Sequence, residues 1–398
     1  MNTLSSELGI IKEEFLSPYN DCEPIIEAFC EDMKKKHTLK MLNTFIFCQN
    51  SIKNGEYLAL DFGGSNIRVS LYEVNNEKIS LKDCRSFALR GDGFDYTTSE
   101  YSLTDIFEMA VDKLEEIIDK DKHYLLGHTF SFAMNSISKI SATVLEFSKG
   151  FNLKDAVGKD INETLREVII KRGLHVVPYT VLNDTTATLL SGFMVDKNTN
   201  MACIVGTGHN MCFVNSMGEI INIESGSFND NTIPLTRYDL MFLDKIPQER
   251  EFLIESLIGG KNSALLVNEV IEDIVSKGLI SPIDNITPKI MSKSLENNIE
   301  ELDELQNCAL REVSGIIYKR AAYLVSCEIV GILRYLEVHE GTYNVVFDGS
   351  VYEKTPYFGE CLTNTLKELL PEGISVTHML VKDGSRTGAV ISCAMNKK

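Results

Sequence analysis

Two glycine-containing turns, each between two apolar segments, constrain the fold of this chain more than any other feature. The first lies in LALDFGGSNIRVSLYEV at residues 58–74, and the second in MACIVGTGHNMCFV at residues 201–214. After the first glycines, apolar and polar residues alternate, which is typical of a strand. A dinucleotide-binding fold would instead have a helix there. Both segments are therefore predicted to be β-hairpins whose turns leave backbone N–H groups open to an anion.

Taken alone, Gly63-Gly64 is an ordinary tight turn, in which the missing Cβ permits positive φ. Its recurrence as a Gly-x-Gly turn at residues 206–208 suggests a duplicated α/β fold that holds phosphate between its halves. Between the two turns, VLNDTTATLL places Asn183 and Asp184 at the carboxyl end of a strand, just before a helix. Asp184 is then either a cap of that helix or a catalytic base facing a crevice.

The composition limits the class of protein and its partners. A chain of 398 residues with 44% hydrophobic residues is long enough for two domains. Its formal net charge of -18 argues against a nucleic-acid partner. The ten cysteines show no zinc-type spacing, and we expect them to be reduced and structural. Without a signal peptide or a membrane-length apolar run, a cytoplasmic protein is expected, as a monomer or a homodimer.

The order of the segments predicts an α/β chain. Helical periodicity runs over residues 23–48, and a pair of strands follows at 56–62 and 66–74, with a further strand near 79–89. A helix at 101–120 is expected to be capped by Ser102 or Thr104. An irregular loop is predicted up to residue 160, a helix ending at Gly173 after it, and a long helical region over about 248–338.

Seven ordered motifs together resemble the hexokinase family, the ATP-dependent sugar kinases of the actin-like ATPase superfamily. YLALDFGGSNIRV and IVGTGHNMCFV are similar to its two phosphate segments, and VLNDTTATLLSG to the motif with the catalytic Asp. GHTFSFAMNSISKISATVLEFSKGFNLKDAVGKDI resembles its sugar-binding signature, and INIESGSF and FLIESLIGG the two segments that each supply a sugar-binding Glu. VVFDGSVYEKTPYF with VKDGSRTGA resembles the adenosine region.

The resemblance implies a role for each matching residue. Asp184 would be the general base that deprotonates a sugar hydroxyl as it attacks the γ-phosphorus of ATP, and Lys149 joins it in the catalytic set. Asp61 would anchor Mg²⁺ through water. The hexose would be bound by Ser131, Ser148, Lys149, Asn183, Asp184, Asn210, Glu224 and Glu255. The cofactor-binding set would join Asp61, through the metal ion, to phosphate contacts at Gly63, Gly64, Ser65, Asn66, Arg68, Gly206, Thr207 and Gly208. The adenosine would be bordered by Asp348, Gly349, Ser350, Gly384 and Ser385.

Several positions depart from the usual pattern of the family. The sequence has Ala133 in place of Pro, Phe147 and Ser148 in place of Trp-Thr, His209 in place of Thr, Ser225 in place of Trp, Phe252 in place of Gln, and Arg386-Thr387 in place of Gly-Lys. His209 would introduce a group that can become cationic near phosphate as the pH falls. These changes bear on affinity and substrate preference more than on activity, because the central polar residues are all present.

The fold implied by the resemblance is the two-lobed, ribonuclease H-like actin ATPase fold with duplicated mixed sheets. The smaller lobe is expected over residues 51–184 with a C-terminal helix at about 381–398, and the larger over 185–380 with the N-terminal 1–50. The function implied is the transfer of the ATP γ-phosphate to the 6-hydroxyl of a hexose, with glucose as the expected substrate, as the first step of glycolysis. The alternative is a non-catalytic, hexokinase-like sugar sensor.

Overall fold

The computed structural model describes residues 3–49, 51–147 and 150–395. These residues form two compact units. Unit 1 comprises residues 1–41, 203–211 and 223–380, and unit 2 comprises residues 42–202, 212–222 and 381–398. Residues 42–50 and 185–202 thus group with 51–184 and the C-terminal segment.

Unit 2 is built on a five-stranded sheet with the order β10-β7-β2-β3-β4. Its strands are β2 (Gly55–Phe62), β3 (Asn66–Asn75), β4 (Lys78–Ala88), β7 (Tyr124–Phe130) and β10 (Val176–Leu182). The predicted hairpin is confirmed, because β2 pairs antiparallel with β3 in a register that places Asp61 opposite Arg68. Strand β7 then runs parallel to β2 and β10.

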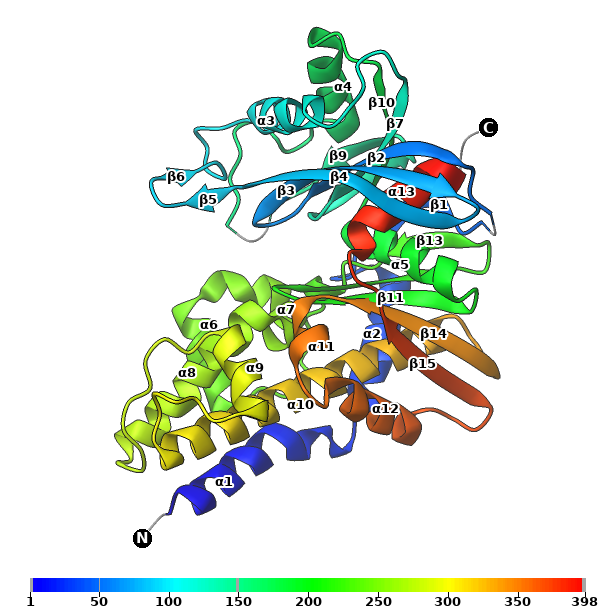
Figure 1. Cartoon of the computed structure of the whole chain (residues 1–398). Helices are drawn as coiled ribbons and strands as arrows, with labels where there is room; N and C mark the ends of the chain where they lie inside the picture. The colour runs from blue at the N-terminus through cyan, green and yellow to red at the C-terminus, as the bar shows by residue number, and fades with distance from the viewer. Residues whose placement is uncertain (1–2, 50, 148–149, 396–398) are drawn as a thin grey trace. The chain divides into compact units, whose positions relative to one another are not determined.

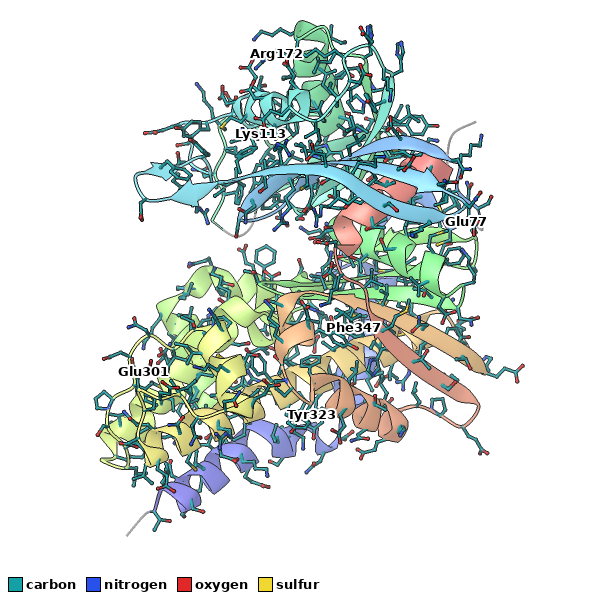
Figure 2. The ribbon with its side chains drawn as sticks, in the orientation of Figure 1. Glu77, Lys113, Arg172, Glu301, Tyr323 and Phe347 are labelled. Carbon is teal, nitrogen blue, oxygen red and sulfur yellow. The ribbon has the colours of Figure 1, made fainter. Side chains whose placement is uncertain are left out.

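Helices cover both faces of this sheet (Figure 1). Helices α3 (Leu103–Glu115) and α4 (Ile161–Lys171) lie over one face, where alternate β2 side chains such as Leu58 and Phe62 enter the core. Figure 2 labels Lys113 on α3 and Arg172 just after α4; Lys113 pairs with Glu116 at 2.6 Å and Arg172 with Asp112 at 2.5 Å. Such exposed pairs contribute little to stability, so the apolar face of each helix holds it in place.

On the opposite face lie helices α5 (Asp184–Val195) and α13 (Gly384–Met395). The backbones approach so closely that glycine is required at two positions. A Cβ on Gly388 would collide with the carbonyl group of Ala187, and a Cβ on Gly127 with that of Ala389. The C-terminal helix is therefore packed directly on the sheet and on α5.

The remaining strands of unit 2 are short or pair outside the main sheet. They include the pairs β5 (Arg90–Gly91) with β6 (Phe94–Asp95) and β8 (Met134–Ser138) with β9 (Ser141–Val144). A second sheet includes strands of both units, with β14 and β15 in unit 1. It has the order β1-β13-β12-β11-β14-β15, formed by β1 (Leu42–Phe47), β11 (Thr199–Val205), β12 (His209–Val214), β13 (Glu219–Asn222), β14 (Gly341–Asp348) and β15 (Ile374–Leu380). The second predicted hairpin, β11 and β12, is thereby confirmed.

Unit 1 is mainly helical and is organised around α10 (Glu304–Tyr335). Most side chains of α10 are buried on all sides, including Arg320 and Glu328. Arg320 pairs with Asp239 at 2.7 Å, with both side chains inaccessible to solvent. Around it lie α1 (Leu4–Leu16), α2 (Glu23–Lys35), α6 (Arg237–Lys245), α7 (Leu253–Ile258), α8 (Gly260–Ser276), α9 (Pro288–Glu296), α11 (Ser350–Lys354) and α12 (Phe358–Leu369), with the 3₁₀ helices η1 (Ser17–Asn20), η2 (Ser225–Ser227) and η3 (Pro247–Phe252).

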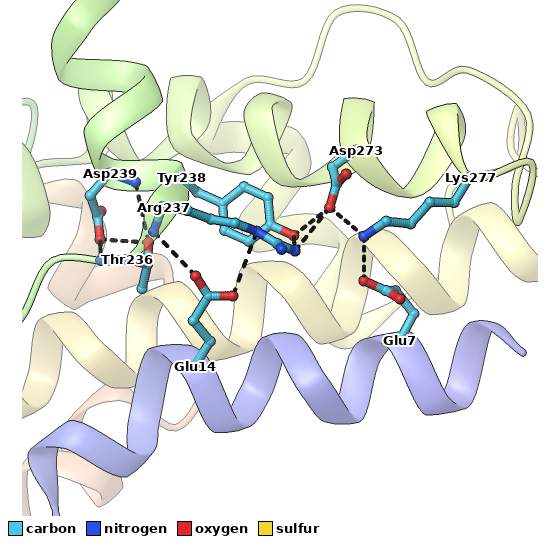
Figure 3. Close-up of polar contacts among 8 residues, drawn as sticks. All are labelled: Glu7, Glu14, Thr236, Arg237, Tyr238, Asp239, Asp273 and Lys277. Carbon is cyan, nitrogen blue, oxygen red and sulfur yellow. Dashed lines mark hydrogen bonds and ion pairs between the residues drawn. The ribbon is translucent and has the colours of Figure 1, made fainter. Parts of the chain in front are cut away.

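Helix α1 is held by charged contacts as well as by its buried face (Figure 3). Lys277, directly after α8, donates to Glu7 of α1 at 2.6 Å and to Asp273 of α8 at 2.7 Å. Arg237 of α6 bridges Glu14 and Asp273 in the same way. The network links α1 to α6 and α8, so the N-terminal helix is an integral part of unit 1.

Two expectations about local structure are wrong. Residues 42–47 form strand β1 and not the end of a helix, because helix α2 stops where Lys36 adopts positive φ. The segment before residue 160 is not an entirely irregular loop, since it contains β8 and β9. The expected helix caps are confirmed, because Ser102 caps α3 and Gly173 adopts a positive φ of 69° after α4.

Candidate active site

Asp61 lies near the end of β2, where it is the centre of a buried polar group. Its carboxylate is 4% exposed and accepts hydrogen bonds from Arg68 Nη1 at 3.2 Å and from Thr129 Oγ1 at 3.1 Å. Burial raises the pKa of Asp61 above the ordinary carboxyl value, Arg68 and Thr129 oppose that shift, and the negative charge of Asp184 adds to it. A divalent cation nearby would supply the positive charge that favours the ionised form of Asp61.

The turn after Asp61 is closed by backbone contacts. Gly63 N–H donates to the carbonyl oxygen of Asn66 at 3.1 Å, and the carbonyl oxygen of Ser65 accepts from Leu89 at 2.9 Å. Neither Gly63 nor Gly64 adopts the positive φ expected from the sequence. Glycine is favoured sterically instead, because a Cβ on Gly63 would lie 3.1 Å from the Asn66 carbonyl oxygen, a tight contact that the turn would have to relieve.

Asp184 is the first residue of α5, directly after strand β10, and it is partly exposed. The helix is capped by its neighbour Asn183, whose side-chain oxygen accepts from Thr185 N–H at 2.9 Å. Asp184 Oδ1 accepts from the same N–H at 2.8 Å, which fixes the orientation of the carboxylate. Among the described residues, no hydrogen-bond donor reaches Oδ2. Asp184 is therefore oriented by one oxygen, and the other can accept a proton.

The sugar-binding signature is only partly described. Ser131 follows β7, is 9% exposed, and its N–H donates to the Phe62 carbonyl oxygen at 3.1 Å. Ser148 and Lys149 lie outside the described residues. Phe147, just before them, packs against Phe132 with a centroid distance of 5.0 Å.

The second glycine turn lies in unit 1 and is held against the start of α8. Gly206 N–H donates to the Gly208 carbonyl oxygen at 3.0 Å, while the Gly206 carbonyl oxygen accepts from Gly260 at 2.8 Å. The Thr207 carbonyl oxygen accepts from Lys261 N–H at 3.3 Å, and Thr207 is exposed. The turn is thus fixed on the start of α8, whose first N–H groups bind its carbonyl oxygens, and Thr207 is left at the surface.

Three of the sugar-binding candidates meet beside this turn. Glu255 Oε2 accepts from His209 N–H at 2.9 Å, and a Cβ on Gly208 would collide with the same oxygen. Asn210 Oδ1 accepts from Ser225 N–H at 3.1 Å, which brings it next to Glu224. Glu224 itself adopts a left-handed backbone conformation with φ 55°, and such strain in a non-glycine residue is concentrated at functional sites.

The adenosine candidates fall in both units. In unit 1, Asp348 ends β14 and its Oδ1 accepts from Gly349 N–H at 2.7 Å. Gly349 has φ 113°, and a Cβ there would collide with the Val205 carbonyl group. Position 349, which lies against the start of the second glycine turn, therefore requires glycine. Ser350 begins α11.

In unit 2, Gly384 begins α13, and its carbonyl oxygen accepts from Ser191 Oγ of α5 at 2.8 Å. Ser385 is the next residue of α13 and is partly exposed. The conformation around both residues is therefore set by the packing of α13 on α5.

Within the described residues, no group of three or more His, Cys, Asp or Glu side chains is placed to hold a metal ion. A divalent cation at Asp61 would accordingly take most of its ligands from phosphate oxygens and water. Mg²⁺ is commonly bound in this way, through one or two carboxylates and substrate phosphates. The donor set at Asp61 fits such an ion.

Family models described as hexokinase match residues 7–194 and 200–395. The chain belongs to the hexokinase family. Among curated relatives, Hexokinase-3 of Oryza sativa subsp. japonica is 28% identical over 420 residues, covering 90% of this chain and 82% of the relative. Hexokinase-1 of Schizosaccharomyces pombe is 25% identical over 461 residues, covering 100% and 92%. A hexokinase from Schistosoma mansoni, solved in complex with glucose, has a TM-score of 0.86 at 24% identity and covers 99% of this chain and 100% of its own.

Membership of the hexokinase family confirms the predicted fold class of two lobes with mixed sheets. It also implies ATP as the phosphoryl donor and a divalent metal ion. None of the described helices is long and apolar enough to span a membrane. All ten cysteines are free, and most of them are buried.

Some departures from the family pattern are explained by local contacts. Arg386 forms an ion pair with Asp383 and donates to Cys84 Sγ at 3.5 Å, so its side chain is held within unit 2. Nothing in the structure explains Ala133, because its contact is a carbonyl oxygen that accepts from Leu145 N–H at 3.0 Å, and proline would offer the same acceptor. Nothing in the structure explains Phe252, which precedes α7.

Sequence reasoning missed two residues of this region. Lys261 lies on the first turn of α8, beside Thr207, and its signal was its place directly after the Gly-Gly of FLIESLIGG. Glu328 is buried in α10 and contacts His209. Its only signal was a single carboxylate in the otherwise apolar run AAYLVSCEIVGIL, because an unpaired buried charge is costly and must have a partner.

Proposed function

We propose that the chain is an ATP-dependent hexokinase that transfers the γ-phosphate of ATP to the 6-hydroxyl of a hexose, with glucose as the first substrate to test. The products would be hexose 6-phosphate and ADP, which would begin glycolysis. The observation that carries this proposal is Asp184, a carboxylate at a strand end with one oriented oxygen and one oxygen without a donor among the described residues.

Asp184 would take the proton from the sugar hydroxyl as that oxygen attacks phosphorus. A positioned general base typically contributes about 10²–10⁴ in rate. Asn183, Ser131, Asn210, Glu224 and Glu255 would bind the other hydroxyls, since carboxylates and amides accept and donate in fixed directions. Ser148 and Lys149 are assigned to the same site from their motif alone.

The phosphates of ATP would bind at the two glycine turns and the adenosine at the candidates of β14, α11 and α13. Mg²⁺, when bound, neutralises negative charge on the phosphates during transfer. Asp61 would orient the water shell of that ion. Arg68 is expected to act mainly through Asp61, because its guanidinium group already pairs with that carboxylate.

A coupled ADP-release assay tests the proposal with glucose, mannose, fructose, glucosamine and N-acetylglucosamine. We expect turnover with at least one hexose, and a loss of about 10²–10⁴ in kcat for Asp184→Asn. This isosteric change keeps the bond from Thr185 but removes the base. Asp160→Asn is a matched control, because Asp160 caps α4 in the same unit by accepting from Glu163 N–H at 2.8 Å.

Unchanged kcat in Asp184→Asn would overturn the assigned base. Absence of turnover with every sugar, together with measurable hexose binding by calorimetry, would favour the non-catalytic sugar sensor. Calorimetry is the suitable binding measurement because the chain contains no tryptophan to report binding by fluorescence.

A further inference from the structure

Three polar side chains form a buried cluster behind the second glycine turn. His209 begins β12, Ser225 begins η2, and Glu328 lies in the middle of α10. His209 Nε2 lies 2.6 Å from Glu328 Oε2 and 3.2 Å from Ser225 Oγ. The side chains of His209 and Glu328 are 0% and 1% exposed. Two departures from the family pattern, His209 and Ser225, are therefore in direct contact.

The contacts determine the charge of the imidazole. Nδ1 lies 3.0 Å from the Ile204 carbonyl oxygen, which can only accept, so Nδ1 carries a proton. Nε2 faces the Glu328 carboxylate, which favours a second proton there. Burial alone would lower the pKa of His209, but the charge of Glu328 and its hydrogen bond outweigh burial and raise it. The contacts therefore favour an ion pair in which the imidazole faces Glu328 and not phosphate.

Other titratable groups also face this imidazole. Glu255 of α7 accepts from the His209 backbone N–H, and its charge also favours the imidazolium. The thiol of Cys203 on β11 lies 3.9 Å from Nδ1. Glu328 from α10 is the carboxylate in contact with the ring, and of the groups that raise the pKa of His209 against burial it has the largest effect.

The cluster connects to the candidate sugar-binding residues through short backbone links. His209, whose ring contacts Glu328, also donates its backbone N–H to Glu255 Oε2 at 2.9 Å. Ser225 is bonded by its side chain to the imidazole and by its N–H to Asn210 at 3.1 Å. Glu224 directly precedes Ser225 and is held in a left-handed conformation.

We propose that His209 and Glu328 are positioning residues that hold Glu255, Asn210 and Glu224 in the geometry that binds the hexose. The proposal rests on the proposed function, since it assigns hexose binding to those three residues. Loss of the pair would let Glu255 and η2 shift relative to each other. Hexose affinity would therefore fall, while the chemical step at Asp184 would be retained.

The test compares two variants with the unmodified protein. Glu328→Gln keeps the shape of the side chain and removes its charge. The double variant His209→Thr with Glu328→Ala removes both members, so that neither is left charged without a partner. The control is His128→Gln, which replaces another buried histidine, in unit 2. Glucose Kd by calorimetry and steady-state kinetics are measured from pH 6 to 9, a range in which glucose itself does not titrate.

We expect the double variant to bind glucose about tenfold more weakly at pH 7, with a matching rise in KM and kcat within about twofold, as for lost uniform binding. Glu328→Gln should also raise the glucose Kd and the KM, by a smaller factor. In the unmodified protein, affinity should fall as the pH rises through the pKa of His209, and this dependence should be absent from the double variant. His128→Gln should leave Kd and KM unchanged.

Unchanged Kd and KM in both folded variants would overturn the positioning role, as would a fall in kcat without a rise in KM. If Glu328→Gln does not fold, the double variant decides the question. Failure of the proposed function gives a different result, because the unmodified protein would then turn over no hexose, whether it still binds one, as a sugar sensor would, or binds none at any pH.

Discussion

The two units each bury the side chain of a histidine, yet the pKa values of the two imidazoles shift in opposite directions. His128 on β7 is 0% exposed and faces the side-chain oxygen of Asn162 at 3.2 Å and the ring of Phe107 at 5.4 Å. Burial lowers its pKa to about 4, so it is neutral at pH 7. His209 is equally buried but faces Glu328, and its pKa is raised.

Because both side chains are buried, the group that faces the ring, and not the depth of burial, decides the direction of each pKa shift. An amide oxygen can orient a neutral imidazole but does not compensate the desolvation of a cation. A carboxylate at 2.6 Å does compensate it. Changing the partner of one histidine should therefore alter the pKa of that histidine and leave the other unaffected.

Removing each partner should give the largest effect. Glu328→Ala would leave His209 either charged without a partner or neutral with a lost hydrogen bond, and we expect a loss of about 3 kcal/mol. Asn162→Ala, the matched change at His128, should cost only about 1–2 kcal/mol, because a neutral bond is lost. Hydrogen exchange in α10 and β7 would measure the two losses. Equal losses would contradict the comparison.

The pH dependence of stability should differ in sign between the two sites. The pKa of His128 is lower in the folded protein than the ordinary 6.5, so its contribution is present above pH 6.5 and lost as the pH falls toward 4. Since one pH unit corresponds to about 1.4 kcal/mol, we expect a loss of about 3 kcal/mol over this window. His128→Gln should remove it, as measured by thermal unfolding between pH 4 and 7.

His209 should act on the alkaline side. The pKa of His209 is raised in the folded protein. Its contribution to stability is therefore complete below the unfolded-state pKa of about 6.5 and is lost as the pH rises through the folded-state pKa. In the same unfolding series extended to pH 9, Glu328→Gln should reduce this alkaline loss. If Glu328→Gln leaves the loss of stability at alkaline pH unchanged, that loss does not come from the pair of His209 and Glu328.

The smallest expected effect concerns only the protons themselves. At pH 7, nitrogen NMR of labelled histidine should show both ring nitrogens of His209 protonated and only one ring nitrogen of His128 protonated. Glu328→Gln should convert His209 toward the neutral form with little change at His128. A neutral His209 in the unmodified protein would refute the ion pair.

Much of the fold could be predicted because its signals are local. The hairpins at the two glycine turns follow from period-two alternation, and the cap of α3 from Ser102. Strand β1 was not predictable in this way, because LNTFIF is too short to distinguish a strand from a continued helix by periodicity alone. Its identity depends on pairing with β13, far along the chain.

In the candidate site too, residues with local sequence signals were predicted, and residues defined by distant contacts were not. Asp184 and Glu255 were found through motifs, in which neighbouring residues carry the information. Glu328 was not, because its partner His209 is more than a hundred residues away in sequence and the contact exists only after α10 has packed. The steric role of Gly63 was likewise hidden, since it depends on where the Asn66 carbonyl points.

The packing of α13 has a consequence for synthesis on the ribosome. Unit 2 needs α13 (Gly384–Met395) to complete, with α5, the cover of the sheet face that carries Gly127, yet all of unit 1 is translated before α13. The strands of unit 2 must therefore wait, with part of one face uncovered, while unit 1 emerges. Nascent unit 2 should be the part of this protein that depends most on chaperones, and truncation before residue 384 should leave it insoluble while unit 1 retains its core.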